Sequence, residues 1–328
     1  MERVNPFRRI YDYINSGDVE TKLQSEFPVL LDLEPTNHCN LHCLMCPTGS
    51  GASKRERGFM AEEIFSKILS ETQNQQVAFH FVRWGEPLLH PQILDFIRAS
   101  KADGHLCHIT TNGFLLAKIG IDKVIESGLD SIKFSFQGVD NHTYGAMRQG
   151  GDFNSLLSII RQFHAFRGDR ASPFIHVTTS ITQESQAEAE AFRDLISPYT
   201  DTLMVGRTKL EHIDPEKTCL SSLEKQKLQQ LKQEESMVRQ HFVQCPFAFD
   251  QLSIGWDGLV NICGRDYDNQ ELTGDLRFES ISTIWKGERR QRLVGLIKDK
   301  KYDQIPICQS CFDFSGLQTS KNIVTSTV

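Results

Sequence analysis

Three cysteines lie within eight residues near the start of the chain, at Cys39, Cys43 and Cys46, with the spacing Cys-x3-Cys-x2-Cys. A closed structural zinc site and a closed four-iron cluster each take four protein ligands. Three thiolates on a four-iron cluster leave one iron open to an outside ligand, such as the amine and carboxylate of an amino acid. The triplet therefore predicts a [4Fe-4S] cluster with an open position, with a zinc knuckle or three incidental core thiols as alternatives.

Four further cysteines lie in the C-terminal part of the chain, with the spacing Cys-x17-Cys-x44-Cys-x2-Cys: Cys245, Cys263, Cys308 and Cys311. Four thiolates can occupy every iron of a second four-iron cluster, although two pairs of cysteines also suit a zinc ribbon. Of the two remaining cysteines, Cys107 is expected to be a small buried thiol and Cys219 an incidental surface thiol.

Composition restricts the class of protein. The chain has 328 residues, of which 39% are hydrophobic and 24% charged, and its net charge is −6, which is typical of a globular protein and argues against nucleic acid as a partner. No apolar run is long enough to span a bilayer, and the N-terminus lacks the pattern of a signal peptide. We expect a cytoplasmic protein without a membrane partner, whose cysteines are metal ligands or free thiols rather than disulfides.

Short β-rich runs alternate with helix-like segments between Phe27 and Arg207. The six runs predicted to be strands are residues 28–35, 77–83, 105–111, 130–136, 173–182 and 201–206. Strands that alternate with helices indicate right-handed parallel crossovers, and so an α/β protein with an open doubly wound sheet or a barrel. Six units are enough for most of a (β/α)8 barrel but not for a closed one.

The remaining segments suggest five parts. Residues 208–243 are polar and predict a connector helix, and a β-hairpin is expected around the Trp-Asp-Gly turn at 256–258, followed by a loop and an amphipathic helix. The expected parts are an N-terminal helical extension (1–26), a partial barrel (27–207), the connector (208–243), a small cysteine-containing module (244–316) and a C-terminal tail (317–328).

The cysteine triplet after a first strand resembles the signature of the radical S-adenosylmethionine (radical SAM) superfamily. Further motifs follow in the order found in that family. "RWGEP", Arg83 to Pro87, is similar to its Gly-Gly-Glu-Pro motif, with Trp84 in place of the first glycine. "TTNG" contains Asn112, "SFQG" contains Ser135 and Gln137, and "MRQGGDF" contains Arg148. The resemblance extends over essentially the whole chain from Pro28 onward.

This resemblance implies a partial (β/α)6 TIM barrel and S-adenosylmethionine as cofactor. In the family, the open iron chelates the methionine part of the cofactor, and cleavage gives a 5′-deoxyadenosyl radical that takes a hydrogen atom from the substrate. Glu86 is then expected to receive the amino group of the cofactor, Arg148 its carboxylate, and Met45 its adenine. The cofactor contacts implied by the motifs are Met45, Gly85, Glu86, Pro87, Asn112, Ser135, Gln137 and Arg148.

The C-terminal module resembles a twitch domain, the shortened form of the SPASM module, which holds one auxiliary [4Fe-4S] cluster. Its cysteine spacing is similar to that of 2-deoxy-scyllo-inosamine dehydrogenase-like enzymes. The resemblance implies a radical SAM oxidoreductase that turns an alcohol of a small polyhydroxylated substrate, a sugar or aminocyclitol, into a ketone, with a flavodoxin or ferredoxin as electron donor. The alternatives are an epimerase, a peptide-modifying maturase, and an iron–sulfur electron carrier without catalysis.

Strand alternation indicates which side chains point into the barrel. Lys133, His80 and His176 are the candidates for the base that takes the hydroxyl proton. Several polar side chains that converge on a barrel interior are expected to line a pocket, because each would otherwise need a buried partner. The others expected there are Glu34, His108, Thr110, Thr178 and Ser180.

Overall fold

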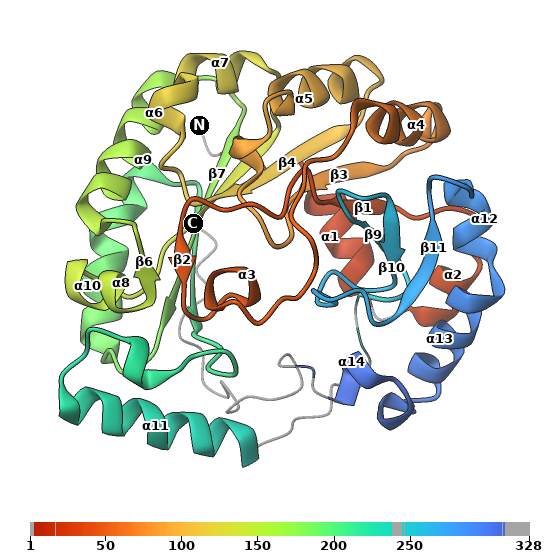
Figure 1. Cartoon of the computed structure of the whole chain (residues 1–328). Helices are drawn as coiled ribbons and strands as arrows, with labels where there is room; N and C mark the ends of the chain where they lie inside the picture. Colours follow the sequence, from red (N-terminus) through yellow and green to blue (C-terminus); the bar gives the residue numbers. More distant parts are fainter. Residues whose placement is uncertain (1–2, 17, 238–244, 246, 310, 312–328) are drawn as a thin grey trace.

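The computed structural model describes residues 3–16, 18–237, 245, 247–309 and 311 (Figure 1). Six parallel strands, which correspond to the six predicted runs, form the central part of a nine-stranded sheet. In spatial order they are β1 (Leu30–Leu33), β3 (Ala78–Phe81), β4 (Leu106–Thr111), β5 (Ser131–Ser135), β7 (Phe174–Ile181) and β8 (Thr202–Arg207). The α/β class and the partial barrel are confirmed.

Helices cover the outer face of these strands (Figure 1). On α9, buried residues at helical spacing, Leu156, Ile160 and Phe163, face the sheet, and the Phe163 ring lies 5.5 Å from that of Phe134 on β5. The covering helices are α4 (Glu62–Thr72), α5 (Ile93–Ala102), α6 (Leu116–Ile119), α7 (Ile121–Glu126), α8 (Asn141–Met147), α9 (Phe153–Arg167) and α10 (Gln186–Ile196). Burial of this face against the strands forms the main hydrophobic core.

The predicted hairpin forms and continues the barrel sheet. β9 (Gln251–Ile254) pairs in parallel with β1, and β10 (Leu259–Asn261) returns antiparallel to β9. The next segment was expected to be a loop, but it forms a third strand, β11 (Leu272–Asp275), because it pairs with the free edge of β10. The part with the second cysteine set is therefore hydrogen-bonded into the same sheet as the barrel.

The predicted C-terminal amphipathic helix is two helices, α12 (Ile281–Lys286) and α13 (Glu288–Lys298), since Gly287 between them has extended backbone. The short η4 (Tyr302–Gln304) and α14 (Pro306–Gln309) follow. The connector contains η3 (Pro215–Lys217) and the predicted helix, α11 (Ser222–Met237), while η2 (Ser197–Tyr199) precedes β8.

The N-terminal segment forms two helices, α1 (Arg8–Asn15) and α2 (Val19–Leu23). Phe7 and Ile14, at the two ends of α1, pack with Leu30 and Ala78, which begin β1 and β3. The helix therefore closes the end of the barrel opposite the cysteine loop. Within the described residues, no helix has both the length and the apolar character that crossing a membrane requires.

Candidate active site

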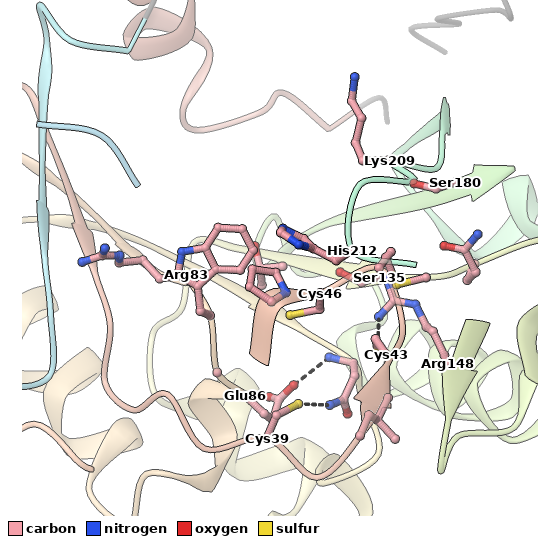
Figure 2. A pocket seen from close by; sticks show the side chains of 18 of the residues that line it. Cys39, Cys43, Cys46, Arg83, Glu86, Ser135, Arg148, Ser180, Lys209 and His212 are labelled. Carbon is pink, nitrogen blue, oxygen red and sulfur yellow. Dashed lines mark hydrogen bonds between the residues drawn. The ribbon is translucent and has the colours of Figure 1, made fainter. Parts of the chain in front are cut away.

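The cysteine triplet lies in the loop that follows β1, at the end of the barrel where the parallel strands terminate (Figure 2). Within this loop, β2 (His42–Cys43) pairs antiparallel with β6 (Arg148–Gln149), and this register places Cys43 opposite Arg148. α3 (Pro47–Ser50) begins directly after Cys46. A Cβ atom on Gly49 would meet the Cys43 carbonyl oxygen at 2.4 Å, so glycine permits this helix to lie against the loop.

All three thiols line one cavity of about 290 Å³. Burial raises the pKa of Cys39 to about 12, and it also raises the pKa of Cys43. Two side-chain N–H groups approach the sulfurs: Arg148 Nη1 lies 3.7 Å from Cys43 Sγ, and Asn112 Nδ2 lies 3.9 Å from Cys39 Sγ (Figure 2). Such donors favour thiolate, the form in which cysteine binds iron, so ligation would release the thiol protons.

Glu86 lines the same cavity, beside Cys39 (Figure 2). Its carboxylate accepts hydrogen bonds from Asn112 N and Thr111 Oγ1, both at 2.8 Å, and from Leu88 N. Burial raises the pKa of Glu86 to about 7. Asn112, directly after β4, in turn donates to Oδ1 of Asn40, the residue after Cys39, at 2.8 Å. Glu86 thus fixes the end of β4 against the cysteine loop.

The residues expected to contact S-adenosylmethionine are brought together, with one exception. Arg148 Nη2 donates to Phe136 O, and its Nε is buried without a hydrogen-bond partner among the described residues. Gln137 Nε2 donates to Thr208 Oγ1 at 2.6 Å. Pro87 is buried in η1 (Pro87–Leu89) and lines neither of the two cavities described here. The expected contacts that do line this cavity are Met45, Gly85, Glu86, Asn112, Ser135, Gln137 and Arg148.

Two more observations show that the chain closes tightly around this cavity. A Cβ on Gly85 would meet the Thr36 carbonyl oxygen at 2.0 Å, so the motif glycine is needed for the loop after β3 to approach the loop after β1. The segment after β8, which the sequence analysis assigned to the connector, also lines the cavity. Its lining residues are Thr208, Lys209, Glu211 and His212, and Arg207 at the end of β8 also lines the cavity; Lys209 and His212 are labelled in Figure 2. No motif marked this segment, and only its position after a barrel strand could have suggested a role.

A second cavity of about 640 Å³ occupies the barrel interior and shares lining residues with the first. His80, Lys133 and His176, the three candidate bases, all line it, as do His108, Thr110 and Thr178. Ser180 instead lines the first cavity. The residues common to both cavities are Val82, Arg83, Trp84, Thr110 and Arg265.

The expectation for Glu34 was wrong. It is fully buried, lines neither of these cavities, and forms an ion pair with Arg55 at 2.7 Å. The expectations for the two remaining cysteines are confirmed, because Cys107 is buried within the main core and Cys219 is exposed.

The three candidate bases differ in the groups around them. His80 Nε2 lies 3.3 Å from Tyr11 Oη and its Nδ1 lies 3.4 Å from Asp32 Oδ1, so both ring nitrogens have neighbours. His176 Nδ1 lies 2.6 Å from Thr202 Oγ1, while its Nε2 is buried without a partner among the described residues. Burial lowers the pKa of His176 to about 4, so the ring is neutral near pH 7. Burial and the charge of Arg265 lower the pKa of Lys133.

Asp32 and Tyr11 were not found from the sequence. Asp32 lies between Leu31 and Leu33, which are both buried against the helices, so strand alternation could have assigned it to the interior. Tyr11 lies on α1, whose docking at the end of the barrel depends on tertiary contacts that no local pattern reveals.

The four C-terminal cysteines are also brought together. Cys245, Cys263, Cys308 and Cys311 pack against one small hydrophobic cluster, and Cys263 also lines the larger cavity. Burial raises the pKa of Cys308 to about 12 and, with the nearby Cys245, raises that of Cys263. Among the described residues, no group of three His, Cys, Asp or Glu side chains surrounds a single metal-ion position.

The loop after β3 joins the two cysteine regions. Trp84 Nε1 donates to the carbonyl oxygen of Gly264 at 2.9 Å, directly after Cys263. Arg83 Nη2 donates to Asp266 O at 3.0 Å, and Arg83 has a positive φ of 84° that is unusual for a residue with a side chain. Trp84, which replaces the first glycine of the motif, and the preceding Arg83 therefore both contact the loop of the second cysteine set.

Comparison with known proteins agrees with this arrangement. The sequence matches the Radical SAM superfamily over residues 33–196 and an iron-sulfur cluster-binding domain, SPASM, over residues 245–312. It is 25% identical to the tungsten-containing aldehyde ferredoxin oxidoreductase cofactor-modifying protein of Pyrococcus furiosus, over 86% of each chain.

Two further matches, one to a sequence and one to a solved structure, differ in how much of the matched protein they cover. Mycofactocin maturase MftC of Mycobacterium tuberculosis is 24% identical over 56% of this chain and 45% of its own length. The crystal structure of BtrN in complex with AdoMet and 2-DOIA covers 86% of this chain and 92% of its own, with a TM-score of 0.55 and 15% identity, and so supports the fold alone.

Proposed function

The chain belongs to the Radical SAM superfamily, and from this premise we propose that it is an oxidoreductase that converts an alcohol of a small polyhydroxylated substrate into a ketone. The two matched domains imply a [4Fe-4S] cluster that binds S-adenosylmethionine and an auxiliary cluster in the SPASM domain. Cys39, Cys43 and Cys46 would hold the first, and Cys245, Cys263, Cys308 and Cys311 the second. A flavodoxin or ferredoxin in the cytoplasm is the proposed electron donor.

One observation supports the oxidation most strongly. The larger cavity shares lining residues with the cofactor cavity and also includes Cys263 in its wall. A substrate there would lie between the two cysteine sets, with proton acceptors on the cavity wall. The donor set fits the implied groups, since one cavity combines three thiols, the buried carboxylate of Glu86 and the buried guanidinium of Arg148.

When bound, the cofactors supply a 5′-deoxyadenosyl radical to take a hydrogen atom and an auxiliary cluster to accept an electron. The protein must remove the hydroxyl proton. We assign this to His176, because it lines the larger cavity, its Nε2 has no hydrogen-bond partner in the described structure and its ring is neutral. His80 and Lys133 are the other candidates. The substrate loses one hydrogen atom, one proton and one electron, which together convert the alcohol into a ketone.

A deuterium-transfer screen tests this function. Reduced holoenzyme is incubated with S-adenosylmethionine and candidate deuterated sugars, cyclitols and peptides, and 5′-deoxyadenosine is analysed by mass spectrometry. A true substrate should transfer deuterium from a single carbon into the nucleoside and yield one oxidised product per nucleoside formed. A protein that cleaves no S-adenosylmethionine under these conditions would instead be an electron carrier.

Epimerisation is the second candidate because Tyr11 lines the larger cavity. A phenol can return a hydrogen atom to a substrate radical from another face, and the sequence had offered no well-placed donor of this kind. The Tyr11 hydroxyl lies 3.3 Å from His80 Nε2, which could orient the phenol. The tyrosyl radical left after transfer of the hydrogen atom would need one electron, from the proposed electron donor, and one proton before the next turnover. A peptide substrate is the third possibility, suggested by the maturase among the relatives, and the same screen includes it.

A further inference from the structure

The larger cavity contains more positive than negative side chains. Arg83, Lys133 and Arg265 line it from β5 and from the loops after β3 and β10, and the described lining residues include a single carboxylate, Asp32. That carboxylate already lies 3.4 Å from His80 Nδ1. Cations that line one confined cavity repel one another, so the arrangement is favourable when an anion lies among them.

Two of these side chains have unused hydrogen-bond donors. Arg83 is tied to the loop of the second cysteine set through Nη2, but its Nε and Nη1 are buried without a partner among the described residues. Lys133 is charged at neutral pH in its ordinary state, yet it forms no hydrogen bond or ion pair within the part of the chain described here. Buried donors without acceptors are costly, and a ligand oxygen would satisfy them.

From these contacts we infer that the substrate bears an anionic group, a carboxylate or a phosphate, which binds Arg83 and Lys133 in the larger cavity. The guanidinium of Arg83 can offer a charge-assisted N–H group from Nε or Nη1 to such an anion, and Lys133 can offer a point charge. This inference rests on the proposed function, since it places the substrate in the same cavity, and it favours an acidic or phosphorylated sugar over an aminocyclitol.

Lys133 then serves as a cation rather than as the base, and the anion raises its pKa by favouring the charged form. The proton acceptor is therefore His176, whose strand position is opposite Lys133 in the register of β5 and β7. The anion-binding cation, Lys133 on β5, and the base, His176 on β7, thus lie on neighbouring strands that line one cavity.

Equilibrium binding to the unreduced holoenzyme with S-adenosylmethionine tests the inference without any turnover. Isothermal titration calorimetry would compare four probes on one scaffold: glucose, glucosamine, glucuronate and glucose-6-phosphate. We expect at least one anionic probe to bind about tenfold or more tightly than glucose, as one charge-assisted hydrogen bond would give. Glucuronate and glucose-6-phosphate distinguish a carboxylate site from a phosphate site.

Variants assign the preference to the named residues. Arg83→Gln and Lys133→Gln should each reduce anion binding about fivefold or more while glucose binding stays the same, and Lys133→Arg should retain the preference. Arg98→Gln, on the exposed face of α5, is the matched control and should behave like the wild type. Iron content checks that each variant is folded.

The inference is overturned if neither anion binds more tightly than glucose, or if the preference survives in both glutamine variants. Cleavage of S-adenosylmethionine, measured separately in reduced samples of the same preparations, reports on the proposed function. A protein that cleaves the cofactor but shows no anion preference would contradict the inference alone.

Discussion

At the scale of single residues, Glu86 has a role that its motif does not reveal. The motif predicts a contact with the cofactor, whereas the structure shows that most of the acceptor capacity of the carboxylate already serves Leu88 N, Thr111 Oγ1 and Asn112 N. Glu86 therefore positions the end of β4 and leaves limited capacity for the amino group of S-adenosylmethionine.

The affinity for S-adenosylmethionine should depend on the charge of Glu86. Burial raises its pKa to about 7, so the carboxylate becomes a stronger acceptor as the pH rises through that value. Wild-type affinity should increase between about pH 6 and pH 8. Glu86→Gln should bind about tenfold more weakly at the upper pH and lose most of this dependence. Glu63→Gln, on an exposed position of α4, is the control, and an unchanged profile in Glu86→Gln would exclude the contact.

His176→Gln should separate product formation from cleavage of S-adenosylmethionine. General-base catalysis typically contributes about 10²- to 10⁴-fold, so product formation should fall by at least about 100-fold while S-adenosylmethionine cleavage persists. Since the pKa of His176 is lowered to about 4, its neutral form is complete above about pH 5 and should impose no pH dependence near neutrality. Undiminished product formation in this variant would assign the proton to another group.

At the scale of elements, the loop after β3 links two regions that the sequence treats as separate. Trp84 departs from the glycine pattern of the motif, and its side chain and that of the preceding Arg83 donate to the backbone beyond Cys263. The departure is therefore explained by contacts between the barrel and the second cysteine set.

Trp84→Phe should perturb the auxiliary cluster without removing it. The change deletes the Nε1 donor to Gly264 O and should cost about 1 kcal/mol of stability, with iron content unchanged. The electron paramagnetic resonance spectrum of the reduced auxiliary cluster should shift, because the backbone beside Cys263 loses its anchor. Trp285→Phe loses a similar bond to Ser25 O and is the control. An identical shift of the spectrum in both variants would mean that the shift does not come from loss of the Trp84–Gly264 hydrogen bond.

The elements show which features a sequence can predict. The six barrel strands and the β9–β10 hairpin have local signals, which are β-rich runs with turn residues between them. β11, and the β2–β6 pairing that places Arg148 beside Cys43, depend on partners distant in sequence. Glu34 was misassigned because side chains alternate between the two faces only within a strand. β1 ends at Leu33, and Glu34 lies just beyond that end.

At the scale of the whole molecule, one continuous sheet from β8 to β11 carries both the loop of the cysteine triplet, after β1, and the loop that contains Cys263, after β10. β9 pairs with β1 along its whole length, from Leu30 opposite Gln251 to Leu33 opposite Ile254. This pairing fixes the loop that contains Cys263 beside the barrel interior, so Cys263 lines the larger cavity, which also shares lining residues with the cavity of the first cysteine set.

Anaerobically reconstituted protein should therefore hold about eight irons, as two four-iron clusters ligated by cysteine. Replacement of Cys39, Cys43 and Cys46 together by alanine should halve the iron and abolish cleavage of S-adenosylmethionine. Replacement of Cys107, which is buried in the main core, by alanine should leave the iron content unchanged. Zinc in the C-terminal module of protein purified without oxygen would contradict the auxiliary-cluster assignment.

The most direct test of the account is the mass and isotope content of the product formed in deuterated water. Once the screen identifies a substrate, the account predicts a product with two hydrogens fewer than the substrate and no solvent deuterium at the reacting carbon. It also predicts that replacement of Cys308 and Cys311 abolishes this product while radical formation partly persists. A product of unchanged composition that carries one solvent deuterium at that carbon would show an epimerase, and would contradict the electron-acceptor role of the second cluster.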